Sequence, residues 1–340
     1  MTHSQRLLVV LKQSAYELYK RRFDAGEVFT NVRWDRLRDR HSSHSTTVNT
    51  LLAFLSKRGV HYQTVKRDDM KPLTLKESEE IDLVVSVGGD GTCLVTSQNL
   101  KYGTPLVAVN SDPTPPEIRK HVYHSSQFDQ ARSTGHLCAC GPDKLTKVMG
   151  EILDGVRQPT KLARIRTLLN GEELMPALND ILIAHPSPAA VSRYSYVWGR
   201  ARKATEQERW SAEGSYQEYQ HVRSSGIRLC TATGSTAANK SAGGQVMQLE
   251  DPRLQYMDRE PISVDGTQCP ISHAFLQPHE ELELRWNSRV GYIYIDGAHT
   301  MREITIGDKL QFSTGGQPLN LYCNQSAQSA RRDQEGGDKA

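Results

Sequence analysis

The stretch that decides the fold is Ile81-Asp82-Leu83-Val84-Val85-Ser86-Val87, which runs directly into Gly88-Gly89-Asp90-Gly91-Thr92. Its first part is short, apolar and rich in β-branched residues, which predicts a buried strand. The three glycines that follow let the backbone turn sharply into a helix expected to begin near Cys93. A strand, a glycine loop and a helix in this order are typical of an open α/β sheet, where ligands bind at the carboxyl ends of the strands.

The flanking sequence predicts further elements of the same sheet. The polar stretch 13–45 has no clear periodicity, but short apolar runs and two amphipathic segments stand out on either side of it. The expected elements are strands at 7–11, 60–65 and 106–109 and helices at 48–55 and 142–156. This alternation predicts an α/β domain with a Rossmann-like parallel sheet over residues 1–140.

After about Leu162 the pattern changes to short segments that alternate apolar and polar residues. They lie at 163–169, 181–184, 227–231, 282–286, 292–295 and 310–313, with turn pairs at Asn170-Gly171, Asp296-Gly297 and Gly307-Asp308. Such segments predict an all-β second domain over residues 141–323. The charged stretch 197–222 is interpreted as an insertion at a hairpin, and residues 324–340 as a disordered tail.

Composition excludes several classes of protein. The chain has 340 residues with 42 basic and 39 acidic side chains, a net charge of +3 that is too balanced for a dedicated nucleic-acid binder. No apolar run approaches the ~20 residues needed to cross a bilayer, so no membrane partner is expected. Six scattered cysteines fit a reducing cytosol, and the pair Cys138 and Cys140 lacks the further ligands of a zinc site. We therefore expect a cytoplasmic protein, with no metal ligands assigned.

The glycine loop carries the strongest chemical signal. Its backbone N–H groups and the helix that follows could bind a polyphosphate. Asp90 inside such a loop would need a task, either to accept the proton of an attacking hydroxyl or to help hold Mg²⁺. The alternative is that Asp90 caps the next helix and the glycines only form a turn.

Two stretches in the second half offer nucleotide contacts. Asn179-Asp180, just before a strand, places an amide beside a carboxylate, and such a pair can bind adjacent ribose hydroxyls. The stretch 231–244 places small hydroxyl residues around Gly234 between a strand and a helix, where a nucleotide could lie. A simple turn and an ordinary capped helix are the alternatives for the two stretches.

In this order the three stretches resemble the motifs of the NAD kinase family, and lipid kinases share only the first. The resemblance extends from about Leu7 to Leu321. It is strongest to the plant-type NADH kinases over residues 109–114, 133–138 and 180–193. The alternatives are a lipid kinase of the diacylglycerol or sphingosine type and a non-catalytic dinucleotide sensor.

The resemblance implies an enzyme that transfers the γ-phosphoryl group of ATP to the adenosine-ribose 2′-hydroxyl of NADH or NAD, with Mg²⁺ accompanying ATP. It also implies a homodimer, and a dinucleotide held between an α/β domain and a β-rich domain. The implied site residues are Asp90 for catalysis, Gly88, Gly89, Gly91 and Thr92 for the ATP phosphates, and Asn179, Asp180, Thr233, Thr236, Ala237 and Ser241 for NAD(H).

Two departures from the family pattern lie near the dinucleotide. Ala238 stands where many members have a tyrosine, and residues 223–226 replace an Asp-Gly pair. They leave the expected reaction intact, but they bear on the preference between the oxidised and the reduced substrate.

Overall fold

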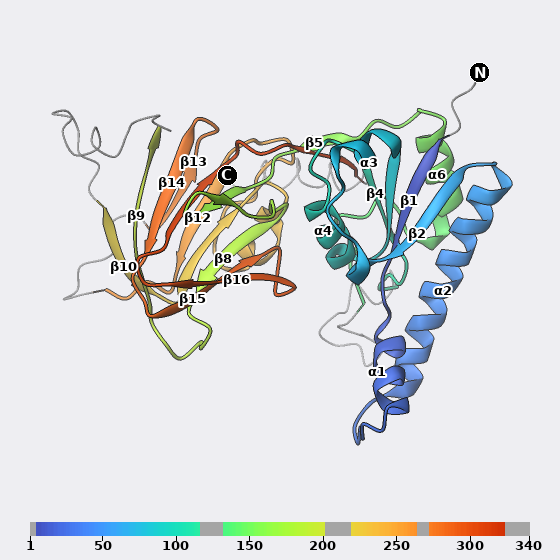
Figure 1. Cartoon of the computed structure of the whole chain (residues 1–340), viewed down its shortest axis with the longest axis horizontal. Helices are drawn as coiled ribbons and strands as arrows, with labels where there is room; N and C mark the ends of the chain where they lie inside the picture. Colours follow the sequence, from blue (N-terminus) through green and yellow to red (C-terminus); the bar gives the residue numbers. More distant parts are fainter. Residues whose placement is uncertain (1–4, 116–131, 201–218, 264–271, 324–340) are drawn as a thin grey trace, which may run out of the picture. The chain divides into compact units, whose positions relative to one another are not determined.

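The computed structural model describes residues 5–115, 132–200, 219–263 and 272–323, which form two compact units (Figure 1). Unit 1 contains the chain up to Lys161 and a strand that begins at Leu319, and unit 2 runs from Leu162 to Pro318. The predicted fold class is confirmed, because unit 1 is an α/β unit with a parallel sheet and unit 2 is built from antiparallel sheets.

Unit 1 is a six-stranded sheet with strand order β2-β1-β3-β4-β18-β5. Its strands are β1 (Arg6–Leu11), β2 (His61–Lys66), β3 (Leu83–Gly88), β4 (Leu106–Asn110), β5 (Thr160–Leu162) and β18 (Leu319–Tyr322). Its helices are α1 (Ala15–Asp24), α2 (Trp34–Lys57), α3 (Leu75–Glu80), α4 (Asp90–Gln98) and α6 (Leu145–Leu153). The pairs β1–β2, β1–β3, β3–β4 and β4–β18 are all parallel, as the βα alternation predicts.

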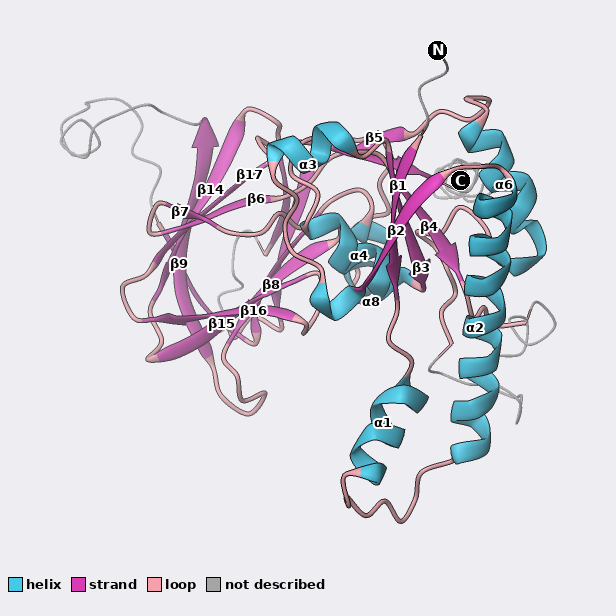
Figure 2. Cartoon of the chain, turned by 45° about the vertical axis from the view of Figure 1, so that its right-hand side comes forward, coloured by secondary structure: helices cyan, strands magenta, loops and turns pink. Residues whose placement is uncertain are grey.

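Helices cover both faces of this sheet. Leu51 of α2 and Met149 of α6 are fully buried in one cluster with Val9, Val85 and Val107 of the sheet. Helix α4 packs against β3 and β4 without joining that cluster, and Figure 2 shows it on the opposite side of the sheet from α2 and α6. Coverage on both faces explains why β3 and β4 are buried along their whole length.

The stretch without clear periodicity, residues 13–45, contains α1 and the first half of α2, joined by a loop at 25–33. Ser14 and Glu17 form a capping box that starts α1, and α2 begins at Trp34, well before the predicted helix. None of the residues of α1 is buried, and the buried residues of α2 begin at His44. Apolar periodicity therefore marks only the half of α2 that packs on the sheet.

The units divide later in the chain than the expected boundary after residue 140. Helix α6 belongs to unit 1 because its apolar face, which includes Val148 and Ile152, completes the core over the sheet. Strand β18 also returns to unit 1, where it pairs with β4. The predicted tail 324–340 lies outside the described residues.

Unit 2 contains two antiparallel sheets of six strands each. One has the order β10-β9-β14-β17-β6-β7 and the other β13-β12-β11-β8-β15-β16. Its strands are β6 (Arg166–Leu169), β7 (Glu172–Glu173), β8 (Asp180–Ala184), β9 (Ser192–Arg200), β10 (Gln220–Ser224), β11 (Gly226–Cys230), β12 (Leu254–Arg259), β13 (His273–Leu276), β14 (Glu280–Trp286), β15 (Val290–Ile295), β16 (Thr300–Thr305) and β17 (Lys309–Ser313).

The two sheets of unit 2 share one core. Tyr194 and Trp286 of the first sheet are stacked with ring centroids 6.2 Å apart, and they belong to the same buried cluster as Ile183 and Tyr256 of the second. A shared inner face of this kind is the packing of a β-sandwich. The predicted turns at Asn170, Asp296 and Gly307 all have positive φ angles of 51°, 52° and 93°.

The predicted hairpin at residues 197–222 is confirmed, but both ends of that range belong to strands β9 and β10 rather than to an insertion. Strands β9 and β10 pair antiparallel, with Tyr196 opposite Gln220, while residues 201–218 between them lie outside the described part of the chain. Within the described ranges, no helix is both long enough and apolar enough to span a bilayer.

Candidate active site

The predicted site residues fall into two groups, one in each unit. Residues 88–92 lie in unit 1 at the junction where β3 ends and α4 begins, and the six predicted dinucleotide contacts lie in unit 2. In unit 1 a distant loop holds the predicted catalytic carboxylate, whereas in unit 2 two of the predicted stretches contact each other directly.

In unit 1, the carboxylate of Asp90 is held by a loop more than forty residues away in the sequence, the segment 133–138. Its Oδ2 accepts from the backbone N–H of His136 (3.1 Å) and its Oδ1 from that of Leu137 (2.9 Å). The hydroxyl of Ser133 donates to Oδ2 (3.3 Å) and accepts from the backbone N–H of Asp90 itself (3.2 Å). Asp90 is therefore fixed in direction while remaining half-buried at the carboxyl end of β3.

This geometry differs from the simple capping alternative. Helix α4 begins at Asp90, but its N-cap is Gly89 and no side chain caps it. The Asp90 carboxylate bonds to the 133–138 loop instead. Burial, followed by the charge of Asp90, raises the pKa of the neighbouring Cys138 thiol, which keeps that thiol protonated and inert.

The three glycines of the loop have unequal surroundings. A β-carbon on Gly88 would lie 2.2 Å from the hydroxyl oxygen of Thr92, and one on Gly89 would lie 2.5 Å from the β-carbon of Ser133. A β-carbon on Gly91 would meet nothing within 4 Å. Gly88 and Gly89 are thus required for internal packing, whereas exposed Gly91 leaves its backbone open to a ligand.

Thr92, the last of the predicted phosphate contacts, is buried. Its hydroxyl lies against the glycine backbone rather than at the surface. In this structure its evident role is to pack the turn.

In unit 2, two of the predicted stretches meet. The hydroxyl of Thr231 donates to the backbone carbonyl of Leu178 (2.6 Å), and its backbone N–H donates to the carbonyl of Asn179 (2.9 Å). Gly234 packs so closely that a β-carbon there would lie 2.2 Å from the Asn179 carbonyl oxygen. The Asn-Asp pair and the Thr-Gly-Ser-Thr stretch therefore form one local structure.

The side chains of the Asn-Asp pair have different environments. Oδ1 of Asn179 is buried, and no donor in the described part of the chain reaches it. Asp180 forms an ion pair with Arg228 of β11, whose Nε lies 3.1 Å from its Oδ2. Burial raises the pKa of Asp180, and the charge of Arg228 opposes that shift. A buried amide oxygen without a donor is costly, so Asn179 is suited to accept a hydrogen bond from a ligand.

The rest of the predicted dinucleotide contacts lie along a short helical segment. It consists of a 3₁₀ turn (Gly234–Thr236) and α8 (Ala238–Ser241). Thr233 is buried, Thr236 is half-buried, and Ala237 and Ser241 are exposed. The structure thus leaves the last two open to solvent within unit 2.

Asp296 is assigned by its sequence to a hairpin turn rather than to a binding role, and its contacts in this group were not predicted. It lies in the predicted turn after β15, but its carboxylate also accepts from the backbone N–H groups of Leu178 (2.9 Å), Asn179 (2.7 Å) and Asp180 (3.2 Å). Burial raises the pKa of Asp296 to about 6 even though these donors oppose the shift. Asp-Gly at a hairpin indicates only a turn, so no local signal could have shown this contact over more than 110 residues.

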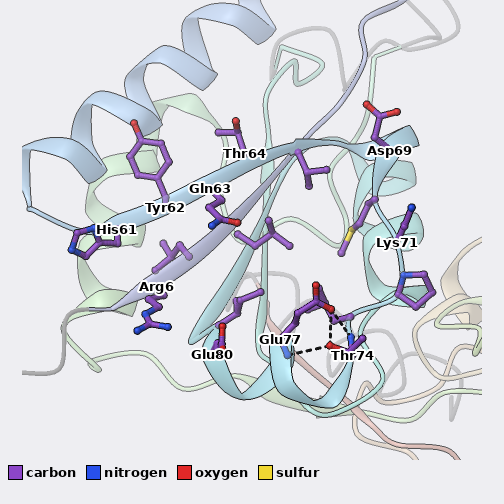
Figure 3. Close-up of a pocket in the computed structure, with 17 residues that line it drawn as sticks. Arg6, His61, Tyr62, Gln63, Thr64, Asp69, Lys71, Thr74, Glu77 and Glu80 are labelled. Carbon is purple, nitrogen blue, oxygen red and sulfur yellow. Dashed lines mark hydrogen bonds between the residues drawn. The ribbon is translucent and has the colours of Figure 1, made fainter.

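A surface hollow of about 1000 Å³ lies elsewhere in unit 1, over β1, β2 and α3 (Figure 3). Figure 3 shows Arg6, Lys71 and Glu80 among the residues that line it, together with the capping box of Thr74 and Glu77. None of the predicted site residues lines it. Its size alone does not connect it to the chemistry of the glycine loop.

Comparisons with known proteins agree with the motif assignment. A rice protein named "Probable NADH kinase" is 40% identical over 286 residues, covering 84% of this chain and 83% of the relative. An Arabidopsis thaliana NADH kinase is 38% identical over 296 residues, covering 87% and 88% of the two chains. No family model matches the chain.

Solved structures show the same fold at low sequence identity. A yeast NADH kinase complexed with NADH matches with a TM-score of 0.64 and 15% identity, covering all of this chain and 90% of the other. An Archaeoglobus fulgidus NAD kinase in complex with ATP matches with a TM-score of 0.60 and 16% identity, covering 98% of each chain.

Proposed function

The chain belongs to the NAD kinase family and is an NAD(H) kinase, and from this premise we propose that NADH is its preferred acceptor and ATP its donor. The 2′-oxygen of the adenosine ribose forms a bond to the γ-phosphorus of ATP. The bond from that phosphorus to the bridging oxygen breaks, ADP leaves, and the hydroxyl proton passes to a base or to solvent. The two plant relatives named NADH kinase, at 38% and 40% identity, support the preference for the reduced acceptor.

The observation that carries the catalytic proposal is the fixed carboxylate of Asp90. Phosphoryl transfer proceeds through a loose transition state in which alignment and charge neutralisation contribute most of the rate. A carboxylate held by two backbone N–H groups and a serine hydroxyl is well suited to align an attacking hydroxyl. Since those bonds fix the direction of the carboxylate, alignment of the hydroxyl is its first task and proton acceptance its second.

In unit 2, we assign Asn179 and Asp180 to the dinucleotide. The buried Oδ1 of Asn179 would accept a hydrogen bond from the ligand. Asp180 would receive a ribose hydroxyl while Arg228 keeps it ionised. Asp296 holds the backbone of this pair and is a positioning residue.

Mg²⁺ would enter with ATP rather than occupy a site built by the protein. Among the described residues, no cluster of three or more His, Cys, Asp or Glu side chains could hold a metal ion. Mg²⁺ in kinases is commonly bound by one or two carboxylates together with substrate phosphates and water. Asp90 is the carboxylate of the loop available for such a contact, and the ion would neutralise phosphate charge.

The decisive experiment compares initial rates on NADH and NAD at saturating MgATP. We expect phosphorylation of both and a higher kcat/KM for NADH. A higher kcat/KM for NAD would overturn the acceptor preference. Dinucleotide binding without any phosphorylated product would overturn the kinase assignment, and diacylglycerol phosphorylation in a parallel reaction would favour a lipid kinase.

We further propose a cytoplasmic homodimer. The reduced cysteine pattern supports the location, since Cys93, Cys138, Cys140 and Cys230 are buried free thiols. Light scattering of the purified chain and fractionation of cells that express it would check the two statements separately.

A further inference from the structure

The segment 109–114, one of those that most resemble the plant-type enzymes, has no role so far. In unit 1 it contacts Ser133 of the loop that holds Asp90. Nδ2 of Asn110 donates to the backbone carbonyl of Ser133 (3.1 Å), and the backbone N–H of Thr114 donates to the same oxygen (3.3 Å). The backbone of Ser133 is therefore held by residues at the carboxyl end of β4, the strand next to β3.

Asn110 also fixes the turn that follows Ser133. Asn110 is only 4% exposed, and a β-carbon on Gly135 would lie 2.5 Å from its Nδ2. Gly135 has a φ angle of 72°, in the left-handed region that glycine adopts without strain. The turn directs the two backbone N–H groups that follow Gly135 to the carboxylate of Asp90.

The hydroxyl of Ser133 uses its whole hydrogen-bonding capacity. A serine hydroxyl can accept two hydrogen bonds and donate one. Oγ of Ser133 accepts from the backbone N–H of Asp90 (3.2 Å) and from that of Gly135 (3.1 Å), which occupies both acceptor positions. Its proton is therefore directed to Oδ2 of Asp90, which lies 3.3 Å away.

This hydroxyl links the two ends of one aspartate. It bonds to the backbone of Asp90 and to the carboxylate of the same residue, so it ties the carboxylate to the first residue of α4. A hydrogen bond to an ionised group is among the stronger ones in proteins. The contact with Ser133 therefore restrains the side-chain torsions of Asp90, in addition to the backbone donors of the loop.

We propose that Ser133 is a positioning residue for phosphoryl transfer, which acts through Asp90 and does not touch the substrate. The inference deepens the proposed function and rests on it, because it concerns the carboxylate assigned to align the acceptor hydroxyl. Without the Ser133 hydroxyl the carboxylate would populate more than one direction, and the attacking oxygen would be aligned in only some of them. Turnover would fall, whereas NADH binding, which is assigned to unit 2, would not change.

The first test compares two serine-to-alanine changes. Ser133→Ala removes the hydroxyl, and Ser86→Ala makes the same change on β3, where the hydroxyl oxygen is buried without a hydrogen-bond partner in the described part of the chain. The fluorescence of NADH measures its Kd and counts the binding-competent sites, so kcat refers to folded protein even if a variant is less stable. We expect kcat to fall about 10-fold in Ser133→Ala with Kd for NADH within about twofold, and both to stay unchanged in Ser86→Ala.

A double-variant cycle distinguishes action through Asp90 from a merely structural role of the turn. In the Asp90→Asn background the carboxylate that Ser133 orients is absent. Adding Ser133→Ala to that background should therefore change kcat by less than about twofold. A structural role would instead lower kcat by a similar factor in both backgrounds.

Four outcomes would overturn the inference. They are a kcat close to the wild type in Ser133→Ala, an equal loss in both backgrounds of the cycle, a similar loss in Ser86→Ala, and NADH binding that weakens as much as kcat falls. If the wild type phosphorylates no dinucleotide, the proposed function fails and this inference fails with it. If the wild type forms the product and Ser133→Ala forms it equally fast, this inference alone fails.

Discussion

Two carboxylates organise the two groups of predicted site residues, one in each unit, in opposite ways. Asp90 belongs to the sequence motif and is held by a distant loop, through the backbone N–H groups of His136 and Leu137. Asp296 lies outside the motifs and itself holds the motif backbone at Leu178 and Asn179. In unit 1 the proposed catalytic carboxylate is itself held by a distant loop, whereas in unit 2 the carboxylate holds the backbone of the proposed binding residues.

This difference shows what each half requires. A carboxylate that aligns a hydroxyl must have a fixed direction and a free side, and half-buried Asp90 has both. The proposed dinucleotide contact needs an unpaired polar atom, and no donor among the described residues reaches the Asn179 Oδ1, while Asp296 accepts from the backbone N–H of the same residue. If this comparison holds, changes in unit 1 should mainly affect turnover, and changes in unit 2 should mainly affect binding or stability.

The largest expected effect comes from Asp90→Asn. The amide cannot accept a proton and places an N–H₂ group where the loop donates, so we expect kcat to fall by about 10³-fold while KM for NADH changes little. Steady-state kinetics with NADH and ATP measure both constants. Asp69→Asn, at an exposed position of the same unit, should leave both unchanged.

The result needs a control for folding, and one outcome would contradict it. Circular dichroism must show the same fold and a similar melting temperature for the Asp90 variant. Turnover close to the wild type would exclude Asp90 from the mechanism and end the distinction between the two halves.

The glycines give the second-largest expected effect, this time on stability. Gly234→Ala would force a β-carbon within 2.2 Å of the Asn179 carbonyl oxygen, and backbone cannot yield as a flexible side chain can. We expect a loss of about 3 kcal/mol in the free energy of unfolding. Urea denaturation measures it.

Gly91→Ala is the matched change in unit 1. Nothing lies within 4 Å of the added carbon, and the residue is in the first turn of α4, so stability should hold or rise by about 0.5 kcal/mol. A raised KM for ATP in this stable variant would support a phosphate near Gly91. A large loss of stability in Gly91→Ala would contradict the interpretation that a β-carbon is tolerated at Gly91 but not at Gly234.

Much of the fold could be predicted because it depends on local pattern. The strands at Leu83–Gly88 and Leu106–Asn110 are buried on both faces and appear in the sequence as continuous apolar runs. The turn residues Asn170 and Asp296 likewise show the hairpins. Helix α1 could not be predicted because it buries no residue, and its start depends on a capping box of two polar residues.

Only those candidate site residues that belong to a sequence motif could be predicted. Asp90 and Asn179 could be identified from their neighbours in the chain, but their partners could not. Ser133 and Asp296 contact them across 43 and 117 residues, and neither contact leaves a periodicity or a spacing in the sequence.

A third buried carboxyl, that of Asp258, should make the free energy of unfolding depend on pH, by up to about 3 kcal/mol. Asp258 of β12 accepts from the hydroxyls of Tyr194 (2.7 Å) and Tyr196 (3.2 Å), and burial raises its pKa to about 6. Because its folded pKa exceeds the ordinary value of 3.8, the protonated form is favoured by folding. Its contribution is complete below pH 4 and is lost as the pH rises through about 6.

The measurement is the difference in unfolding free energy between the wild type and Asp258→Asn from pH 4 to pH 7. The amide does not titrate, so the wild type should lose stability relative to the variant across this range. The comparison cancels the titration of Asp296, which is present in both proteins. If the difference in unfolding free energy does not change with pH, then the tyrosine hydroxyls offset the effect of burial and Asp258 stays ionised in the folded protein over this range.

The smallest expected effect is the most direct test of the positioning role of Asp296. In Asp296→Asn the amide oxygen can still accept from Asn179 and Asp180, but the N–H₂ group then faces the backbone N–H of Leu178, so the Asn-Asp backbone should shift. We expect KM for NADH to rise about 10-fold while kcat stays within about twofold. Asp308→Asn is the control, because Asp308 also accepts a backbone N–H at a turn, that of Thr305 (2.7 Å), away from the motif. It should lower stability by about 1 kcal/mol and leave KM unchanged. If instead Asp296→Asn lowers kcat as strongly as Asp90→Asn, then Asp296 takes part in the chemistry, and the two carboxylates act together rather than as an anchored group and an anchor.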